Sequence, residues 1–159
     1  MSWTIRRMAD GDIDAVVALA EKISEAPHWN REEYVRCGAP DGTASLQRSG
    51  FVAGVEGELL GFSVGKLVAG VCELESVAVL PENRGQGIGR ALFDAVADWA
   101  LASGAARMEL EVRASNHRGI KLYERAGLRR EGLRPAYYQS PEEDAVLMGK
   151  ALLTGGKLS

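Results

Sequence analysis

One stretch of the sequence, from Leu74 to Leu92 (LESVAVLPENRGQGIGRAL), limits the possible folds more than any other. It begins as an apolar strand, continues through a short loop, and places three glycines at the start of a helix: Gly85, Gly87 and Gly89. Backbone N–H groups at glycine approach a ligand without hindrance from a Cβ atom, and a helix N-terminus adds about half a positive charge beside them. This order of elements predicts a binding site for a pyrophosphate. An incidental glycine-rich turn is the alternative.

Two other phosphate-binding loops do not fit this spacing. A dinucleotide-binding Rossmann turn places GxGxxG directly after the first strand of a βαβ unit. Here the spacing is GxGxG, residues 81–83 separate strand from glycines, and about seventy residues precede the strand. A P-loop needs GxxxxGK followed by Ser or Thr, and the sequence contains no such string. The sequence therefore argues against nucleoside triphosphate chemistry.

The first part of the chain is predicted to form a strand and two helices. Ser2–Arg7 has a strand pattern, and Asp10 is the expected N-cap of a helix whose apolar residues recur at helical spacing: Ile13, Val16, Val17, Ala20 and Ile23. Asn30 followed by Glu33 has capping-box spacing and predicts a second, short helix through Tyr34. We expect the two helices to form a hairpin before the main sheet.

From residue 51 onward the pattern is rich in strands. Three β-branched stretches over 51–56, 59–68 and 71–79, with turns at Gly57 and Gly70, predict an antiparallel meander. Helical patterns follow over 87–103 and from Ser115 or Asn116 to Gly127, with strands over 108–113, 128–138 and 145–152. This order predicts one mixed α/β sheet of six to seven strands, mostly antiparallel, with helices on both faces.

Length and composition limit the size of the molecule and its partners. With 159 residues the chain suits one domain, and its apolar runs fall short of the about 18 to 20 residues of a membrane helix. No secretory segment is visible, so a soluble, cytoplasmic protein is expected. A net charge of −3 gives no electrostatic case for nucleic acid. Cys37 and Cys72 lack metal-site spacing, and His28 and His117 stand apart, so no metal is expected.

The glycine loop resembles the Arg/Gln-x-x-Gly-x-Gly/Ala signature of the GCN5-related N-acetyltransferase (GNAT) superfamily. The resemblance implies the GNAT fold, acetyl-CoA as cosubstrate, loop amides that hold the pyrophosphate, and a strand that splays from its neighbour so that its backbone pairs with pantetheine. It assigns cofactor contacts to Val77, Ala78, Val79, Arg84, Gly85, Gln86, Gly87, Ile88, Gly89, Arg90, Asn116 and Tyr123. Asn116 also suits an N-cap, and the two roles are compatible.

A second stretch, LEVRASNHRGIKLYERAGL from Leu110 to Leu128, resembles the RimI-type ribosomal-protein alanine N-acetyltransferases of the same superfamily. The Arg-x-x-Tyr-Tyr and Glu-Asp-Ala motifs near the end of that family match Arg134, Tyr137, Tyr138, Glu143, Asp144 and Ala145. The likeness is strongest over 74–148. In two departures, Leu128 replaces a common Phe, and His28 is inserted between Pro27 and Trp29, on the substrate side.

The resemblance implies a single GNAT domain over 1–159. It contains an N-terminal strand and helix hairpin (1–50), a cofactor-binding core (51–113) and a C-terminal substrate-side segment (114–152). Trp29, Tyr137 and Tyr138 are the implied substrate contacts, although the two tyrosines also suit plain aromatics of an edge strand.

The acceptor amine needs a base, because an α-ammonium has a pKa of about 7.7 to 8.0 and is mostly protonated at neutral pH. The resemblance assigns this role to Glu111, through water. The rival carboxylates are Glu73, Glu75 and Glu109, and orientation alone cannot separate Glu109 from Glu111, since residues two apart share a strand face. The resemblance also makes Tyr123 the proton donor to the departing thiolate, the alternative being a core tyrosine.

Together these residues predict direct acetyl transfer in a ternary complex, with the thioester carbonyl polarised by a strand N–H around Val79. The predicted acceptor is a protein N-terminus, and specifically the N-terminal alanine of a small-subunit ribosomal protein. The alternatives are a small-molecule amine, another protein's N-terminus, or a catalytically silent acyl-CoA-binding module. The chain is expected to be a monomer or weak dimer without membrane contact.

Overall fold

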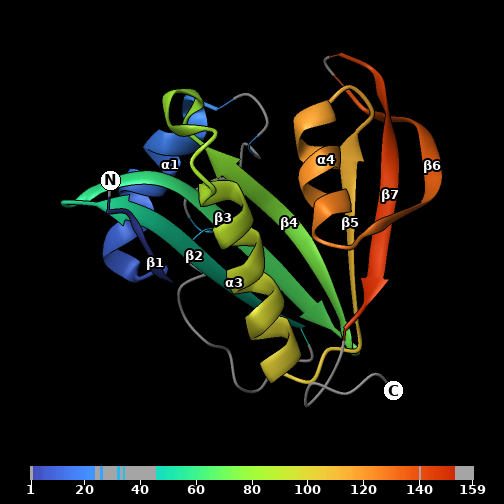
Figure 1. Cartoon of the computed structure of the whole chain (residues 1–159), viewed down its shortest axis with the longest axis horizontal. Helices are drawn as coiled ribbons and strands as arrows, with labels where there is room; N and C mark the ends of the chain where they lie inside the picture. The colour runs from blue at the N-terminus through green and yellow to red at the C-terminus, as the bar shows by residue number, and fades with distance from the viewer. Residues whose placement is uncertain are drawn as a thin grey trace.

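The computed structural model describes residues 2–23, 26, 32, 34, 46–139 and 141–152. Seven strands form one mixed sheet in the order β1-β2-β3-β4-β5-β7-β6 (Figure 1). The elements are β1 (Thr4–Arg7), the 3-10 turn η1 (Asp10–Asp12), α1 (Ile13–Glu21), β2 (Leu46–Val55), β3 (Glu58–Val68), β4 (Val71–Val79), the 3-10 turn η2 (Pro81–Asn83), α3 (Ile88–Ala102), β5 (Arg107–Arg113), α4 (His117–Arg125), β6 (Arg129–Tyr138) and β7 (Glu143–Ala151). The predicted helix over 30–34 lies largely outside the described residues.

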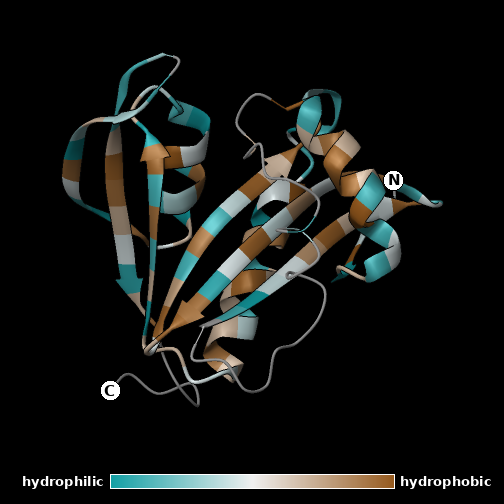
Figure 2. Cartoon of the chain, turned by 180° about the vertical axis from the view of Figure 1, so that it is seen from behind, coloured by the Kyte–Doolittle hydropathy of each residue, from teal (hydrophilic) through white to brown (hydrophobic). Residues whose placement is uncertain are grey.

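Helices cover both faces of this sheet, as predicted (Figure 1). On one face α1 packs its buried side chains, such as Ile13 and Val16, with Phe62 and Val64 of β3. On the other face α3 places Phe93 in one core with Met108 of β5 and residues of α4. Figure 2 shows the alternation of hydrophobic and hydrophilic residues along the strands on the α1 side. This alternation is what a sheet covered on both faces by amphipathic helices requires.

The start of the first helix differs from the prediction. Asp10 opens the turn η1, and α1 begins only at Ile13. Asp12, not Asp10, makes the end contacts: its carboxylate accepts from Ala9 N at 2.8 Å and pairs with Arg6 at 2.7 Å. The hydrogen bond from Arg6 lowers the pKa of the Asp12 carboxyl. The contacts of Asp12 with Ala9 and Arg6, and not a cap by Asp10, therefore fix the turn before α1.

The central strands β4 and β5 separate soon after they meet. They pair in parallel only at Val71↔Arg107, Cys72↔Met108 and Glu73↔Glu109, and then diverge (Figure 1). Just beyond this point β4 shifts register against β3 between Leu74 and Ser76, a bulge of the kind that bends a strand away from its ladder. The predicted splayed pair is therefore confirmed, and it leaves a gap in the middle of the sheet.

No helix within these described ranges is long and apolar enough to cross a membrane.

Candidate active site

The glycine loop between β4 and α3 depends on its glycines for two different reasons. Gly85 and Gly87 have φ angles of +83° and +85°, which side chains of L-residues rarely adopt. Gly87 is also the N-cap residue of α3. At Gly89 the limit is space, because a Cβ there would lie 3.0 Å from the Leu122 Cδ1 atom of α4. The loop can therefore turn its backbone toward a ligand while α3 lies close to α4.

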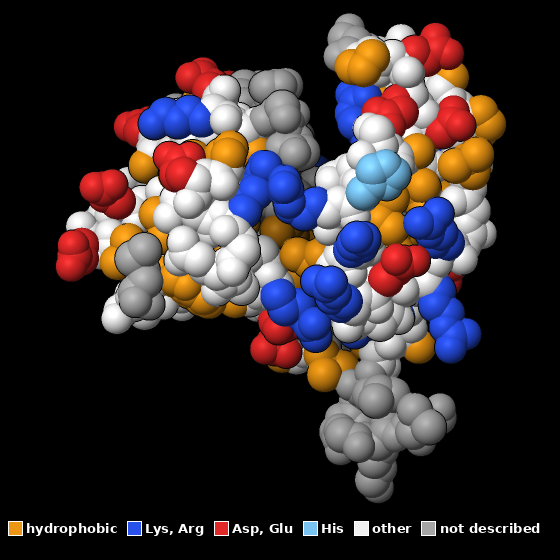
Figure 3. Space-filling model, turned by 45° about the horizontal axis from the view of Figure 1, so that its top comes forward, with side chains coloured by type: hydrophobic (Ala, Val, Ile, Leu, Met, Phe, Trp, Pro, Cys, Tyr) orange, Lys and Arg blue, Asp and Glu red, His pale blue; other side chains and the backbone are white. Residues whose placement is uncertain are grey.

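A cavity of about 380 Å³ lies beside this loop. Every predicted cofactor contact lines it except Gln86, which is exposed. Six further lining residues were not predicted: Ile23, Asn83, Arg118, Gly119, Leu122 and Arg125. Figure 3 shows Lys and Arg side chains gathered on both sides of a hollow whose floor is hydrophobic.

The chemistry of this lining suits coenzyme A. Arginines at 84, 90, 118 and 125 and the N-terminus of α3 provide positive charge for phosphates, while Val77, Val79, Ile88 and Leu122 provide an apolar wall for an aliphatic arm. Arg118 and Arg125 are seven residues apart with Leu122 between them, so all three lie on one face of α4. That spacing is visible in the sequence, but it points to this cavity only once α4 is placed against β4 and α3.

Helix α4 is fixed at both ends. Asn116 Oδ1 accepts from Gly119 N at 3.0 Å, so the predicted N-cap is confirmed, and the same residue lines the cavity. At the other end Lys150 Nζ donates to Ala126 O at 2.8 Å. These contacts hold the helix that carries Tyr123.

Tyr123 is 8% exposed, contacts Phe93 with ring centroids 6.0 Å apart, and lines the cavity. Its burial, and to a smaller extent Tyr138, raises the pKa of its hydroxyl. A phenol with a raised pKa stays protonated at neutral pH and can donate that proton to a leaving group in the cavity.

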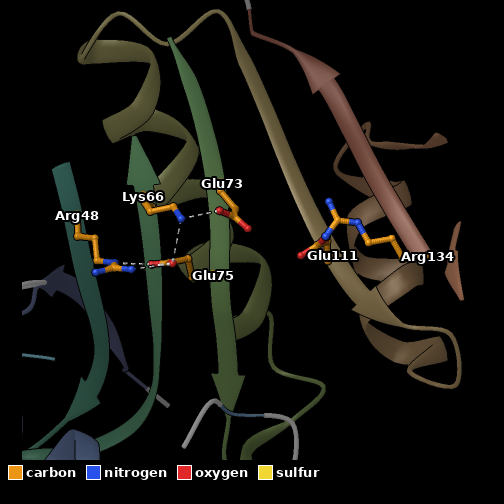
Figure 4. A network of polar contacts seen from close by, with 6 residues as sticks. All are labelled: Arg48, Lys66, Glu73, Glu75, Glu111 and Arg134. Carbon is orange, nitrogen blue, oxygen red and sulfur yellow. Dashed lines mark hydrogen bonds and ion pairs between the residues drawn. The ribbon is translucent and has the colours of Figure 1, made fainter. Parts of the chain in front are cut away.

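Glu111 lies on β5 at the other side of the gap. Its neighbours Leu110 and Val112 enter the core under α3 and α4, so its own side chain points to the opposite face. There Arg134 Nη1 lies 3.0 Å from Glu111 Oε2, and the Tyr137 hydroxyl donates to the same carboxylate. Figure 4 shows the Glu111 carboxylate projecting into the space between β4 and β5.

The structure separates Glu111 from its rivals by their contacts. Glu75 pairs with Arg48 at 2.8 Å and Glu73 with Lys66 at 3.0 Å, both on the β2–β4 side of the gap (Figure 4). Glu109 pairs with Arg107 at 2.8 Å. Of the four carboxylates, Glu111 is the one that pairs with Arg134. These pairings distinguish the four side chains, and the role of Glu111 as the base stays a prediction.

The predicted substrate tyrosines stand together at this carboxylate. The rings of Tyr137 and Tyr138 are 5.0 Å apart, edge to face, and the Arg113 guanidinium lies 4.4 Å from the centre of the Tyr138 ring. Burial first, and then Glu111, raises the pKa of Tyr138 to about 12. Glu111 contributes to the raised pKa of Tyr138, and Tyr138 contributes to that of Tyr123, so Tyr138 lies within electrostatic range of both. Trp29, the third predicted contact, lies outside the described residues.

In the part of the chain that the structure describes, no three His, Cys, Asp or Glu side chains are arranged so that they could hold a metal ion.

We expect Gly87→Ala to weaken acetyl-CoA binding about tenfold. The new Cβ has open space around it, so the loss comes from the φ of +85°, whose strain costs about 1–3 kcal/mol in an L-residue and is relieved by moving the loop. Gly70→Ala is a matched control, since Gly70 has a φ of +81° and open space but lies in the β3–β4 turn. Titration calorimetry with acetyl-CoA measures both, and equal affinities in the two variants would contradict the loop assignment.

Comparisons with known proteins agree with this geometry. The sequence profile of the acetyltransferase (GNAT) family matches residues 16–128. A Bacillus subtilis (strain 168) protein, provisionally named ribosomal protein bS18-alanine N-acetyltransferase, is 30% identical over 144 residues, 91% of this chain and 92% of that protein. The ribosomal protein bS18-alanine N-acetyltransferase of Escherichia coli (strain K12) is 37% identical over 94 residues, 58% of this chain and 64% of that protein. The crystal structure of the ribosomal-protein-S18-alanine N-acetyltransferase from Escherichia coli has a TM-score of 0.81, 28% identity and 99% coverage of both chains.

Proposed function

The chain belongs to the acetyltransferase (GNAT) family, and on that premise we propose that it acetylates the α-amino group at a protein N-terminus, with the N-terminal alanine of ribosomal protein bS18 as its substrate. The observation that carries this proposal is the position of Glu111 on β5 beside the gap, where it pairs with Arg134 at 3.0 Å, together with that of Tyr123 in the lining of the cavity beside α3. A carboxylate that can take a proton faces the acceptor side, and a phenol that can give one faces the cofactor cavity. The names of the relatives point to the acceptor.

The cavity beside α3 is the proposed site of acetyl-CoA, which supplies the acetyl group as an activated thioester. Gly85, Gly87 and the N-terminus of α3 would hold its pyrophosphate with Arg84 and Arg90, and Arg118 and Arg125 would neutralise further phosphate charge. Leu80 N donates to Leu60 O at 2.9 Å, and donors alternate in direction along a strand, so the N–H of Val79 points into the gap. That N–H would polarise the thioester carbonyl.

Proton transfers complete the proposed mechanism. Glu111 takes a proton from the α-ammonium, through water, and so frees the nitrogen lone pair for attack on the acetyl carbon. Tyr123 gives a proton to the coenzyme A sulfur as the carbon–sulfur bond breaks, and the second proton that the nitrogen loses on becoming an amide returns to Tyr123 through water. Tyr137 and Tyr138 would border the first residues of the acceptor peptide. The amide product and the thiol leave without a covalent enzyme intermediate.

The test uses a peptide with the first residues of the host's bS18, beginning with alanine, and the same peptide with its α-amine blocked. We expect thiol release and an intact-mass gain of one acetyl group on the free peptide alone. Gain on neither peptide, despite acetyl-CoA binding, would overturn the substrate and favour a small-molecule amine or a silent module. Gain on both would place the acetyl group on a side chain instead.

A further inference from the structure

The strand β6 contains an irregularity opposite one acidic residue. It pairs with β7 at Arg134↔Ala145 and next at Tyr138↔Glu143, so residues 135–137 stand opposite Asp144 alone. We call these three residues the β6 bulge. At its centre Ala136 has a φ of +52°, a left-handed conformation that non-glycine residues rarely adopt.

The side chain of Asp144 holds this conformation. Asp144 Oδ1 accepts from Ala136 N at 2.9 Å. The preceding residue, Pro135, has no N–H to offer, so the Ala136 N–H is the donor that the centre of the bulge presents to β7. Asp144 also keeps its place in the sheet, because its carbonyl oxygen accepts from Ala114 N at 3.0 Å. The Asp144 carboxylate is therefore held in place by β7 and accepts the hydrogen bond of the strained residue Ala136.

The bulge changes the directions of the side chains around it. In a regular strand Arg134 and Tyr137, three residues apart, would point to opposite faces, yet both contact Glu111. Neighbours such as Tyr137 and Tyr138 would also point apart, yet their rings lie 5.0 Å from each other. The extra residues of the bulge therefore turn Arg134 and Tyr137 onto one carboxylate.

We propose that Asp144 is a positioning residue that fixes the β6 bulge and so holds Arg134 and Tyr137 against Glu111. The inference rests on the proposed function in so far as Glu111 is the base. It assigns to the Asp of the Glu-Asp-Ala motif a role that the mechanism above leaves open.

The neighbouring Glu143 has a separate role. Its carboxylate accepts from Ser115 N at 2.5 Å and lies 3.3 Å from Arg113, whose guanidinium covers the Tyr138 ring. Tyr138 is thus supported by Glu143 through Arg113, and Tyr137 by Asp144 through the bulge. Loss of Asp144 should therefore move Tyr137 and spare Tyr138.

We expect Asp144→Ala to lower kcat/KM for the acceptor peptide at least about tenfold, with the KM for acetyl-CoA unchanged, since the strained backbone at Ala136 loses the acceptor of its N–H. Asp144→Asn keeps an oxygen acceptor and should stay within about threefold of the wild type. Ala136→Val should reproduce the loss, because a β-branched residue resists positive φ, whereas Ala136→Gly should not. Asp144→Asn as slow as Asp144→Ala, or Ala136→Val as fast as wild type, would overturn the proposal.

A second readout does not depend on activity. The hydrogen bond to Glu111 raises the pKa of the Tyr137 hydroxyl. In Asp144→Ala this pKa should fall toward the ordinary value of about 10, measured by NMR titration of 13C-labelled tyrosine and assigned with Tyr137→Phe. An unchanged titration in Asp144→Ala would overturn the proposal. If the wild type does not acetylate the peptide, the proposed function fails, and this titration still decides the role of Asp144.

Discussion

Replacing Glu111 by glutamine is expected to lower the turnover number by about 10²–10⁴-fold while acetyl-CoA affinity stays the same. Glutamine has nearly the shape of glutamate, and its amide oxygen can still accept hydrogen bonds from Arg134 and Tyr137, so the arrangement around residue 111 should persist. What it cannot do is take a proton from the α-ammonium. The cofactor cavity has no lining atom from Glu111, so binding of acetyl-CoA should not change.

The matched control for this variant is Glu109→Gln. Glu109 lies two residues earlier on the same face of β5, is about half exposed, and pairs with Arg107. Its substitution should leave turnover within about twofold, as expected for an exposed ion pair. Thiol release under saturating peptide and acetyl-CoA compares the two variants. If Glu109→Gln were slow and Glu111→Gln as fast as the wild type, the base would be Glu109 and not Glu111.

The elements of the fold were predictable because their signals are local. Gly57, Gly70 and Gly127 all have positive φ at the turns where the sequence placed them. Asn116 caps its helix for the same reason, since a cap acts within one turn. The start of α1 shows the limit of such local signals. Asp10 and Asp12 are both suitable residue types for a helix start, and Asp12 makes the contacts there because it pairs with Arg6 of the preceding strand.

The irregular features of the sheet were not predictable from local patterns. A bulge is defined by its partner strand, so neither the register shift at Glu75 nor the β6 bulge could be seen without knowing which strands pair. β6 is not adjacent to β5, because β7 lies between them. The contact of Arg134 and Tyr137 with Glu111 therefore crosses a strand, and only the resemblance had linked these motifs to the site.

The lining of the cavity beside α3 was better predicted than the surroundings of Glu111, and the reason is again distance along the chain. Most of the predicted lining residues come from one continuous segment, β4 to α3, whose geometry is local. Arg118 and Arg125 were missed because their value depends on how α4 lies against that segment. The acceptor side is assembled from β5, β6 and β7, and its part at Trp29 lies outside the described residues.

Tyr123→Phe is expected to lower turnover by about 10²–10⁴-fold with little loss of stability, because the ring that packs against Phe93 is kept and only the donor is removed. Burial raises the pKa of Tyr123, so the hydroxyl stays protonated above the ordinary tyrosine pKa of about 10. The wild-type rate should therefore show no alkaline decline from this group below about pH 10.

Single-turnover thiol release from pH 6 to pH 10, with thermal melting as the stability readout, separates the two roles of Tyr123. If Tyr123 is only a core residue, Tyr123→Phe should lower the melting temperature and leave the rate unchanged. If Tyr123 is the proton donor, the same variant should lower the rate and leave the melting temperature unchanged. Tyr138→Phe is the control for loss of a neighbouring hydroxyl. A thiol pKa of about 8.5 makes the thiolate a fair leaving group even without a donor. A rate unchanged by Tyr123→Phe would therefore mean that coenzyme A leaves as the thiolate, and that the reaction needs a base but no proton donor from the protein.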